Sequence, residues 1–400
     1  MKFGILKERK NPPDHRVVFS PEALVRLQKQ YPDFAVRVES SDIRVFKDQE
    51  YQEAGIEVVD DVSDCDVLIS VKEIPVTALV ADKAYFFFSH TIKKQPHSRA
   101  LLQAVLAKNI DLYDHETIVD ENNRRLIGFG KYAGYVGVYN SIRAFGVKFQ
   151  LFKLPHANTL GGKDELIRYL KRLVLPPIKI VITGKGKVGK GAKEILDAIK
   201  IKEVSIDNYL TKKYAQSVYT QIGVLDYYKR KDNQEFDFEN FKENREAFES
   251  HFERFSKVSD IYISGHFYDN ESPAILTREM LQSKDCQIKV VADISCDVNG
   301  PVACTLRAST IAEPFYGYLP SENKECEVYH PAAIVVMAID NLPSELPRDA
   351  SIGFGEMFIE HVIPAFFNDD KDGILQRAQI TKGGKLTPRF SYLQEYVDGK

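Results

Sequence analysis

The sequence has no apolar run that approaches the roughly 18–20 residues of a membrane-spanning helix. Its most apolar segments, such as YFFFSH and AAIVVMAI, have the lengths of buried strands and helices. The first residues, MKFGILKERK, return to charged side chains too soon to form the apolar region of a signal peptide. These absences predict a cytoplasmic protein that does not enter a membrane.

An excess of charge of one sign is also lacking. The 54 Lys and Arg residues nearly balance the 57 Asp and Glu residues, and the formal net charge is −3. A balanced chain gives no reason to expect nucleic acid or an anionic membrane as a partner. Affinity for anions must therefore come from local clusters of cations.

Cysteines are few and show no pattern. They are scattered, odd in number and form no CxxC pair, and no HxH motif or carboxylate cluster is present. This favours reduced, buried thiols over disulfides or a zinc site, and no metal is expected. The cysteines are Cys65, Cys286, Cys296, Cys304 and Cys326.

A chain of 400 residues is longer than one hydrophobic core usually serves, so two domains are expected. The first third alternates short apolar runs with helical patterns, which predicts a mostly parallel sheet covered on both faces. The first helix, over 21–30, opens with Ser20 as N-cap and Pro21 at its first position. The expected strands of this region are 2–6, 34–39, 66–73, 85–90 and 110–114.

A second alternating region begins near residue 178, after an apolar-periodic stretch over 139–152 that predicts a long helix. Between 227 and 255 the pattern is interrupted by charged and aromatic residues, which predict a solvated insertion of loop plus charged helix. The amphipathic stretch at 355–367 and the C-terminal RFSYLQEYVD are expected to pack back on the first domain. The expected strands of the second region are 178–184, 203–207, 261–265 and 289–295.

A glycine-rich turn follows the strand expected at 178–184 and precedes a good amphipathic helix. In the order strand, GxGxxG, helix, the glycines permit a tight turn, close approach of a pyrophosphate and close packing of the helix. The loop comprises Gly184, Gly186, Lys187, Val188 and Gly189. It predicts a dinucleotide site, with a plain surface turn as the alternative.

The strand expected at 203–207 ends in Asp207, at about the offset where a carboxylate meets the adenosine ribose. A carboxylate there favours NAD over NADP, although the lysines of the glycine loop keep NADP possible. The loop also differs by one residue from a P-loop, but Gly191 replaces the Ser or Thr that holds Mg²⁺, which argues against ATP.

Two polar residues stand at the ends of apolar strands in the first domain, Lys72 and His90. The carboxyl edge of a parallel sheet is where ligands bind, although a solvated lysine and a structural histidine are ordinary at such places. Several cations and amides lie nearby in the sequence, namely Arg16, Lys93, Gln95, Arg124 and Arg125.

The motifs as a set resemble the saccharopine dehydrogenases and the related lysine–ketoglutarate reductases, within the alanine dehydrogenase/transhydrogenase group. The matching stretches run in family order over most of the chain. They are KERKNPPDHRVVFSPEAL, DVLISVKEIP, YFFFSHTIKKQ, LYDHETIVDENNRRLIGFGKYAGYVG, VITGKGKVGKGA, VADISCD and AIDNLPSELPRDAS. Val188 and the insertion depart from the family pattern.

The resemblance implies a role for each matching residue. Lys72 would be the proton acceptor and His90 its acid–base partner, with Glu116 tuning the pair. Arg16, Lys93, Gln95 and Arg125 would hold substrate carboxylates, and Arg124 and Phe129 would lie where cofactor and substrate meet. Asp340, Asn341 and Leu342 match a stretch that closes over the nicotinamide.

Together these arguments predict an α/β protein with two Rossmann-like, doubly wound domains and a cleft between them. Residues 1–131 with 342–400 would form the substrate domain, and 132–341 the NAD-binding domain. The resemblance implies NAD-dependent cleavage of saccharopine to L-lysine and 2-oxoglutarate. Alternatives are an NADPH-dependent lysine–ketoglutarate reductase, an alanine dehydrogenase-like enzyme, and a nucleotide-sensing module. The expected partners are these small molecules, and the oligomeric state stays open.

Overall fold

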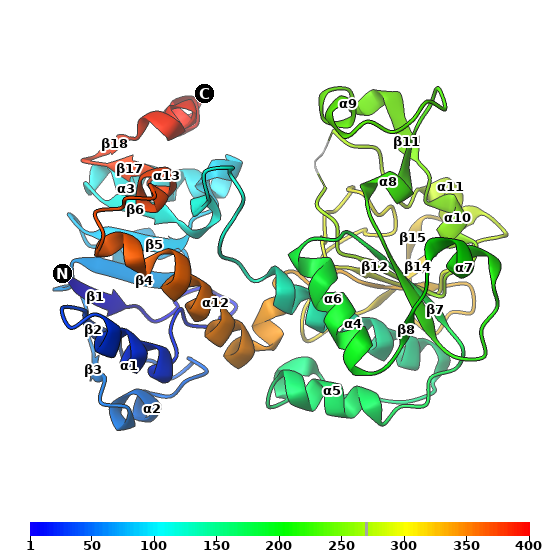
Figure 1. Ribbon diagram of the computed structural model, residues 1–400, viewed down its shortest axis with the longest axis horizontal. Coiled ribbons are helices and arrows are strands. Elements are labelled where there is room, and N and C mark those ends of the chain that lie inside the picture. The colour runs from blue at the N-terminus through cyan, green and yellow to red at the C-terminus, as the bar shows by residue number, and fades with distance from the viewer. Residues whose placement is uncertain (269–270) are drawn as a thin grey trace. The chain divides into compact units, whose positions relative to one another are not determined.

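The computed structural model describes residues 1–268 and 271–400, which form two compact units. Unit 1 comprises Met1–Phe129 and Pro347–Lys400, and unit 2 comprises Gly130–Leu346 (Figure 1). The boundaries differ from the sequence-based ones by two and five residues. They fall where helix α4 (Gly130–Phe149) and helix α12 (Pro347–His361) begin, because Leu342 and Leu346 pack into the core of unit 2.

The sheet of unit 1 has six strands in the order β3-β2-β1-β4-β5-β6, and every pair in it is parallel. Strand order reverses on the two sides of β1, as in dinucleotide-binding folds. The strands are β1 (Lys2–Ile5), β2 (Ala35–Glu39), β3 (Glu57–Val59), β4 (Val67–Lys72), β5 (Ala84–Phe88) and β6 (Asp111–Asp114). All five strands expected in this region are present, and β3 is an additional one.

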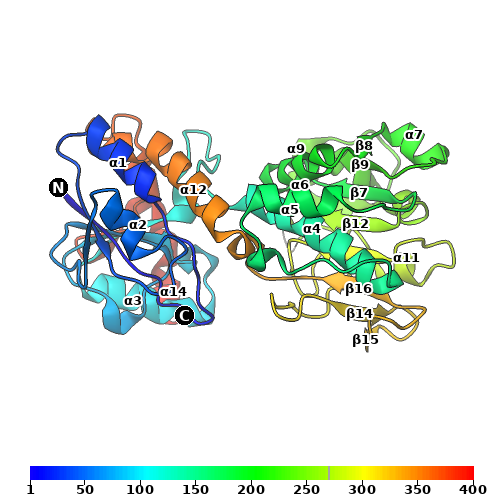
Figure 2. The ribbon, with the colours of Figure 1, turned by 90° about the horizontal axis from the view of Figure 1, so that it is seen from below.

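Two hydrophobic cores cover the two faces of this sheet, because neighbouring residues of each strand point to opposite sides. Phe86 of β5 packs with helix α1 (Pro21–Gln30) and α12, whereas Phe87 packs with α3 (Arg99–Ala107). Figure 2 shows α1 and α12 together, and α3 with α14 (Gln394–Asp398). The remaining elements of unit 1 are α2 (Asp48–Glu53), α13 (Ile374–Ala378), β17 (Thr381–Lys382) and β18 (Lys385–Leu386).

Local sequence explains where these helices begin. Ser20 accepts a hydrogen bond from the backbone N–H of Ala23, and Pro21 occupies the first turn of α1, as predicted. The C-terminal segment packs back on unit 1, also as predicted, with Leu393 and Tyr396 in the core that contains α3.

Unit 2 contains an eight-stranded sheet in the order β15-β14-β16-β13-β12-β7-β9-β8. It is parallel from β16 to β8, whereas β14 pairs antiparallel with both of its neighbours, β16 and β15. The strands are β7 (Lys179–Thr183), β8 (Lys202–Glu203), β9 (Val218–Ile222), β12 (Ile261–Ser264), β13 (Val290–Asp293), β14 (Tyr316–Leu319), β15 (Lys324–Cys326) and β16 (Ile334–Met337).

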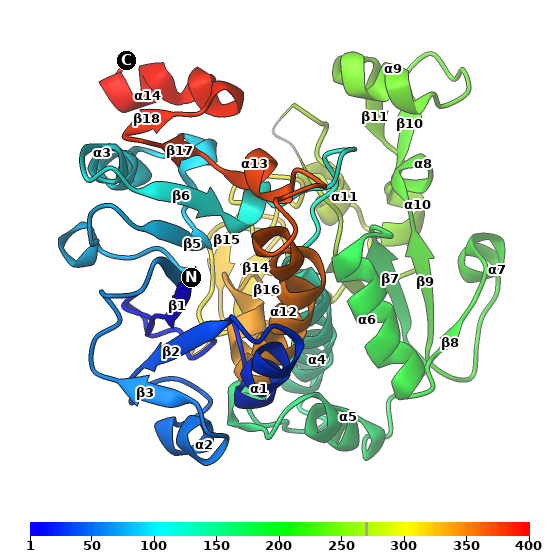
Figure 3. The same cartoon turned by 60° about the vertical axis from the view of Figure 1, so that its left-hand side comes forward.

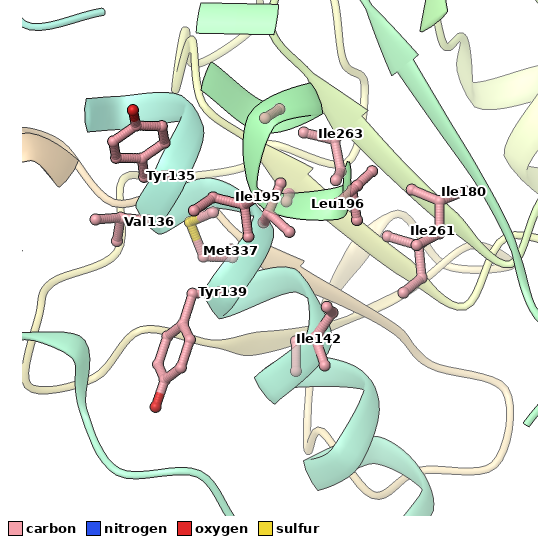
Figure 4. Packing of buried hydrophobic residues seen from close by; sticks show 14 of the residues in the cluster. Tyr135, Val136, Tyr139, Ile142, Ile180, Ile195, Leu196, Ile261, Ile263 and Met337 are labelled. Carbon is pink, nitrogen blue, oxygen red and sulfur yellow. The ribbon is translucent and has the colours of Figure 1, made fainter. Parts of the chain in front are cut away.

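One face of this sheet is covered by α4, α5 (Lys163–Lys171) and α6 (Lys187–Ala198). Figure 4 shows Tyr139 and Ile142 of α4 with Ile195 of α6 over the strands. A Cβ on Gly134 would lie 2.2 Å from the carbonyl oxygen of Val188, so α4 and α6 approach backbone to backbone. Likewise a Cβ on Gly191 would lie 2.2 Å from the Lys131 oxygen, so the hydroxyl residue of a P-loop has no room there.

The insertion, defined as residues 227–255, is more ordered than the sequence predicted. It forms an antiparallel pair, β10 (Tyr228–Arg230) and β11 (Phe248–Ser250), with helix α9 (Phe238–Glu243) between the two strands. The predicted charged helix is present, and most residues from 231 to 246 are exposed. The prediction was wrong for the aromatic residues, because Phe241, Phe248, Phe252 and Phe255 pack into the core on the second face of the sheet. The other helices of unit 2 are α7 (Ile206–Thr211), α8 (Val224–Tyr227), α10 (Glu253–Ser256) and α11 (Arg278–Gln282).

A second prediction, the strand at 203–207, was also wrong. The strand is only Lys202–Glu203, and Ser205 then caps α7, so Asp207 lies in the first turn of a helix. On this side of the sheet the strand that pairs directly with β7 is β9, which comes later in the chain than β8, and β12 pairs with the other side of β7.

Candidate active site

Lys72 is the last residue of β4, at the carboxyl edge of the sheet in unit 1. It pairs with Phe88 of β5 at an irregularity in the register, and His90 follows two residues after Phe88. Neighbouring strands lie about 4.8 Å apart, so the sheet brings both predicted residues to one edge. Glu8 accepts hydrogen bonds from the backbone N–H groups of Val71 (2.7 Å) and Lys72 (2.9 Å), which holds the irregular end of β4 in place.

The surroundings of Lys72 disfavour its charged form. Burial lowers the pKa of the Lys72 ammonium, and the positive charge of Arg16 lowers it further, against the opposing effect of Asp14. Arg16 pairs with Asp14 through Nε–Oδ1 (2.9 Å) and Nη2–Oδ2 (2.6 Å), and both side chains are 2% exposed. The Arg16 guanidinium also lies 4.3 Å from the centre of the Phe129 ring.

His90 adopts a left-handed backbone conformation (φ 56°) directly after β5, at the start of a 3-10 turn. Its Nδ1 lies 3.2 Å from Oε2 of Glu116. Burial raises the pKa of the Glu116 carboxyl, but the hydrogen bond with His90 and the charges of Lys93 and Arg125 outweigh it and lower the pKa to about 2. Glu116 is therefore an anion near neutral pH and orients the imidazole.

Two predicted cations converge on the same carboxylate. Lys93 Nζ lies 3.4 Å and Arg125 Nη1 lies 3.7 Å from Glu116 Oε1, and their side chains are 48% and 41% exposed. Gln95 is exposed just beyond Lys93 and accepts a hydrogen bond at its backbone oxygen from Tyr396. Arg124 lies apart from this group, since it is 76% exposed and pairs with Asp120 within its own turn.

Sequence reasoning missed four carboxylates of this site: Glu8, Asp14, Glu73 and Asp114. Asp114 is fully buried and accepts from the backbone N–H groups of Ser89 and Glu116, so it joins the segments that carry His90 and Glu116. Glu73 binds Lys10 through one oxygen, and its other oxygen is buried with no hydrogen-bond partner among the described residues. A signal was present for three of them, because PDHR, VKE and DHE place Asp14, Glu73 and Asp114 within two residues of a predicted residue, whereas Glu8 has no predicted residue beside it.

The glycine loop of unit 2 has the geometry that its sequence predicts. Gly184 has φ +91°, and a Cβ there would lie 2.5 Å from the Gly265 oxygen. A Cβ on Gly186 would meet nothing within 4 Å, so the backbone at the start of α6 is open to a ligand. Among the other predicted residues of the loop, Lys187 is exposed, Val188 is partly buried and Gly189 is buried under the turn.

A cavity of about 780 Å³ opens on this loop within unit 2. Its walls come from the loop, from the segment after β9, from the segment after β12 and from the insertion. Asp207 is not among the lining residues, but Asp226, in the helix that follows β9, is. The carboxylate expected beside the glycine loop is therefore supplied by a different residue.

The last predicted cofactor residues follow β16. Asp340 is exposed, Asn341 adopts a left-handed conformation (φ 65°), and Leu342 is 2% exposed in the core of unit 2.

All five cysteines are unpaired, with Cys65 and Cys304 buried. Over residues 1–268 and 271–400, no cluster of His, Cys, Asp and Glu could hold a metal ion, and no helix has the length and apolarity to cross a bilayer.

Comparison with known proteins finds the same α/β fold. Residues 4–136 match the family model "Alanine dehydrogenase/PNT, N-terminal domain". The whole chain superposes on the solved structure of an L-alanine dehydrogenase with a TM-score of 0.65 at 18% identity, covering 100% of this chain and 99% of that one. This likeness establishes the fold.

The curated relatives show more specifically which enzymes this chain is similar to. The chain is 27% identical to the α-aminoadipic semialdehyde synthase of Arabidopsis thaliana over 98% of its own length, but spans only 41% of that protein. It is 25% identical to the saccharopine dehydrogenase [NAD(+), L-lysine-forming] of Yarrowia lipolytica over 90% of both chains. The chain is thus related to the saccharopine dehydrogenases and aminoadipic semialdehyde synthases, as its motifs predicted.

Proposed function

We propose that the chain catalyses the pyridine-nucleotide-dependent interconversion of saccharopine with L-lysine and 2-oxoglutarate, with NAD as the oxidant in the lysine-forming direction. One observation carries the proposal: Lys72, His90 and Glu116 share a sheet edge with the cations Lys93 and Arg125. The relatives named saccharopine dehydrogenase support the choice of substrate.

The cations suit a substrate with several negative charges. Saccharopine is a secondary amine that carries three carboxylates. The Arg125 fork suits a planar carboxylate, and Lys93 supplies a point charge. Both side chains are nearly half exposed while they touch Glu116, so a substrate carboxylate can compete for them.

Lys72 would act as the base. Oxidation of the C–N bond requires that the secondary amine lose its proton, so the base must be neutral when the substrate binds. Burial and the nearby Arg16 charge lower the pKa of Lys72, which raises the fraction of neutral amine at a given pH. Glu8 fixes the backbone from which this side chain extends.

His90 would then direct the hydrolysis of the imine. The bond between Nδ1 and the Glu116 carboxylate orients the ring and leaves Nε2 to take a proton from water as it attacks the imine carbon. The same nitrogen can return that proton to the departing lysine amine. Products are L-lysine and 2-oxoglutarate, and the reverse sequence joins them.

The residues of unit 2 fit a pyridine nucleotide. Gly186 leaves open space at the start of α6, where backbone N–H groups and the helix dipole favour a pyrophosphate. When bound, the oxidised nucleotide supplies the hydride acceptor for the substrate carbon. We also expect the nucleotide to contact Lys187, Val188 and Asn341.

Two enzymatic alternatives have their own support. An NADPH-dependent reductase that joins lysine and 2-oxoglutarate would use the same residues in reverse, and the aminoadipic semialdehyde synthases are the relatives that favour it. An alanine dehydrogenase-like activity is favoured by the family match over residues 4–136.

The test is consumption of NADH or NADPH at 340 nm with lysine plus 2-oxoglutarate, beside ammonia plus pyruvate. We expect turnover with lysine plus 2-oxoglutarate, faster with NADH. Turnover only with ammonia and pyruvate would replace the proposal with an alanine dehydrogenase. Nucleotide binding without turnover in any assay would refute it and favour a nucleotide-sensing module.

A further inference from the structure

The insertion forms one wall of the cavity in unit 2. Phe238 and Phe241 of α9 line the cavity, together with Lys242 and Arg245. In Figure 3 the insertion lies beyond α8, past the end of β9. Phe241 is 6% exposed and anchored among Tyr228 and Phe248, whereas Phe238 is 48% exposed and presents its ring at the surface of the wall.

The cavity wall also carries a buried polar atom that has no hydrogen-bond partner among the described residues. His266 follows β12 and is 7% exposed, and its Nδ1 lies 2.7 Å from Oγ1 of Thr183. Its Nε2 is buried and has no hydrogen-bond partner within the described part of the chain. Burial lowers the pKa of this histidine to about 4, so the ring is neutral near pH 7 and can hydrogen-bond a ligand hydroxyl.

Asp226 lies at the position where the topology of the sheet predicts a ribose-binding acid. In dinucleotide folds this acid follows the strand adjacent to the one that leads into the glycine loop. Two strands pair with β7, namely β9 and β12, and β9 comes first in the chain; Asp226 comes four residues after Ile222, the last residue of β9. Its Oδ2 accepts from the Gly223 backbone N–H at 2.7 Å and lies 3.8 Å from Lys185 Nζ, so the carboxylate is held facing the loop.

We propose that the insertion and Asp226 together recognise the adenosine half of the pyridine nucleotide, and that Asp226 sets the preference for NAD over NADP. The identity of the nucleotide rests on the proposed function. The insertion is then a selectivity element of the nucleotide site.

Each part has a physical role in this arrangement. The half-exposed ring of Phe238 offers a face on which the adenine stacks. Asp226 accepts hydrogen bonds from the ribose hydroxyls and repels a 2′-phosphate. Lys185, Lys242 and Arg245 also line the cavity, so removal of the Asp226 charge leaves a cationic pocket that suits the 2′-phosphate.

The experiment compares Asp226→Asn with Asp207→Asn in the full chain. Asn keeps an oxygen that can accept from the Gly223 N–H, which protects the fold. Dissociation constants are measured for NADH and NADPH by nucleotide fluorescence, and for ADP and adenosine 2′,5′-bisphosphate by calorimetry. We expect Asp226→Asn to shift the NADH-to-NADPH preference toward NADPH by about tenfold, equal to 1.4 kcal/mol, and Asp207→Asn to leave it unchanged.

A second pair of variants tests the insertion. Phe238→Ala removes a half-exposed ring from the cavity wall, and Phe149→Ala removes a ring that is 42% exposed on α4, outside the cavity. Since stacking on an aromatic ring is insensitive to the 2′-phosphate, Phe238→Ala should weaken the binding of NADH, NADPH and ADP alike by about tenfold. Phe149→Ala should leave all three unchanged.

The outcomes separate this inference from the proposed function. Unchanged binding in Asp226→Asn and Phe238→Ala, or a shift caused by Asp207→Asn instead, would overturn the inference even if saccharopine is turned over. Altered nucleotide binding without saccharopine turnover would support the inference and refute the proposed substrate.

Discussion

At the scale of single residues, the candidate site depends on acidic side chains that set the orientation and the electrostatic surroundings of the basic groups. Asp14 pairs with Arg16, Glu116 orients His90, and Glu8 holds the strand end that carries Lys72. The basic residues were predictable, because they stand at the ends of apolar strands and match a family pattern. Their acidic partners were not singled out, since an acid beside a base in sequence is usually a solvated surface residue.

The first prediction concerns Lys72. Lys72→Met should reduce kcat for saccharopine oxidation by about 10²–10⁴-fold, the usual contribution of a positioned base. Because the neutral amine is the active form and its pKa is lowered, the wild-type rate should rise with pH and reach its plateau below the ordinary lysine value of 10.5. The pH profile of kcat/KM for saccharopine checks this. Near-wild-type turnover in the variant would assign the base elsewhere.

The second prediction concerns Glu116 and acid stability. Its pKa is about 2 in the folded chain and 4.5 in the reference state, so its contribution to stability is complete above pH 4.5 and is lost as the pH falls toward 2. Glu116→Gln should remove this loss, which is at most roughly 3 kcal/mol. The free energy of unfolding in urea, measured between pH 5 and 2.5 for both proteins, tests this. If it falls with pH in the same way in the wild type and in the variant, the prediction is wrong.

At the scale of elements, the parallel strands matter because they bring their carboxyl ends to one edge. Five of the six strands of unit 1 were predictable from their apolar runs, whereas β3, β9 and the insertion were not. The run VYTQI is short and half polar, and its place beside β7 depends on pairing across 39 positions of sequence, from Lys179 to Val218. The aromatics of the insertion are irregularly spaced, so their burial follows from the core that receives them.

The third prediction compares two glycines of the loop. A Cβ on Gly189 would lie 2.0 Å from the Gly184 oxygen, whereas a Cβ on Gly186 would meet nothing within 4 Å. Gly189→Ala should therefore lower the melting temperature, since backbone must move. Gly186→Ala should keep the wild-type melting temperature but weaken NADH binding, because the methyl group occupies the approach to the helix start. Equal effects of the two variants on stability would show that the loop has room at Gly189.

At the scale of the whole molecule, each unit contains its own sheet and its own hydrophobic cores on both faces of that sheet. The composition and length predicted two such units, and the alternation of strands and helices predicted their class. A cytoplasmic location stays a prediction.

The fourth prediction is that the units respond differently to a nucleotide. We expect two thermal transitions by calorimetry, and NADH should raise only the one that belongs to unit 2. At a hundred times the dissociation constant, the gain of about 2.7 kcal/mol corresponds to a rise of roughly 5–10 °C. Hydrogen exchange assigns the transitions to units. An equal rise of both transitions would contradict the prediction.

The fold class, the glycine loop and the lysine–histidine edge follow from the amino-acid sequence, because each depends on local patterns: apolar runs, a strand–turn–helix order and strand ends. The packed structure was needed to find that Asp226 rather than Asp207 faces the loop, and that the insertion lines the cavity. Both depend on which strands pair and which rings are buried, and pairing between distant segments is a property of the packed sheet rather than of any one segment.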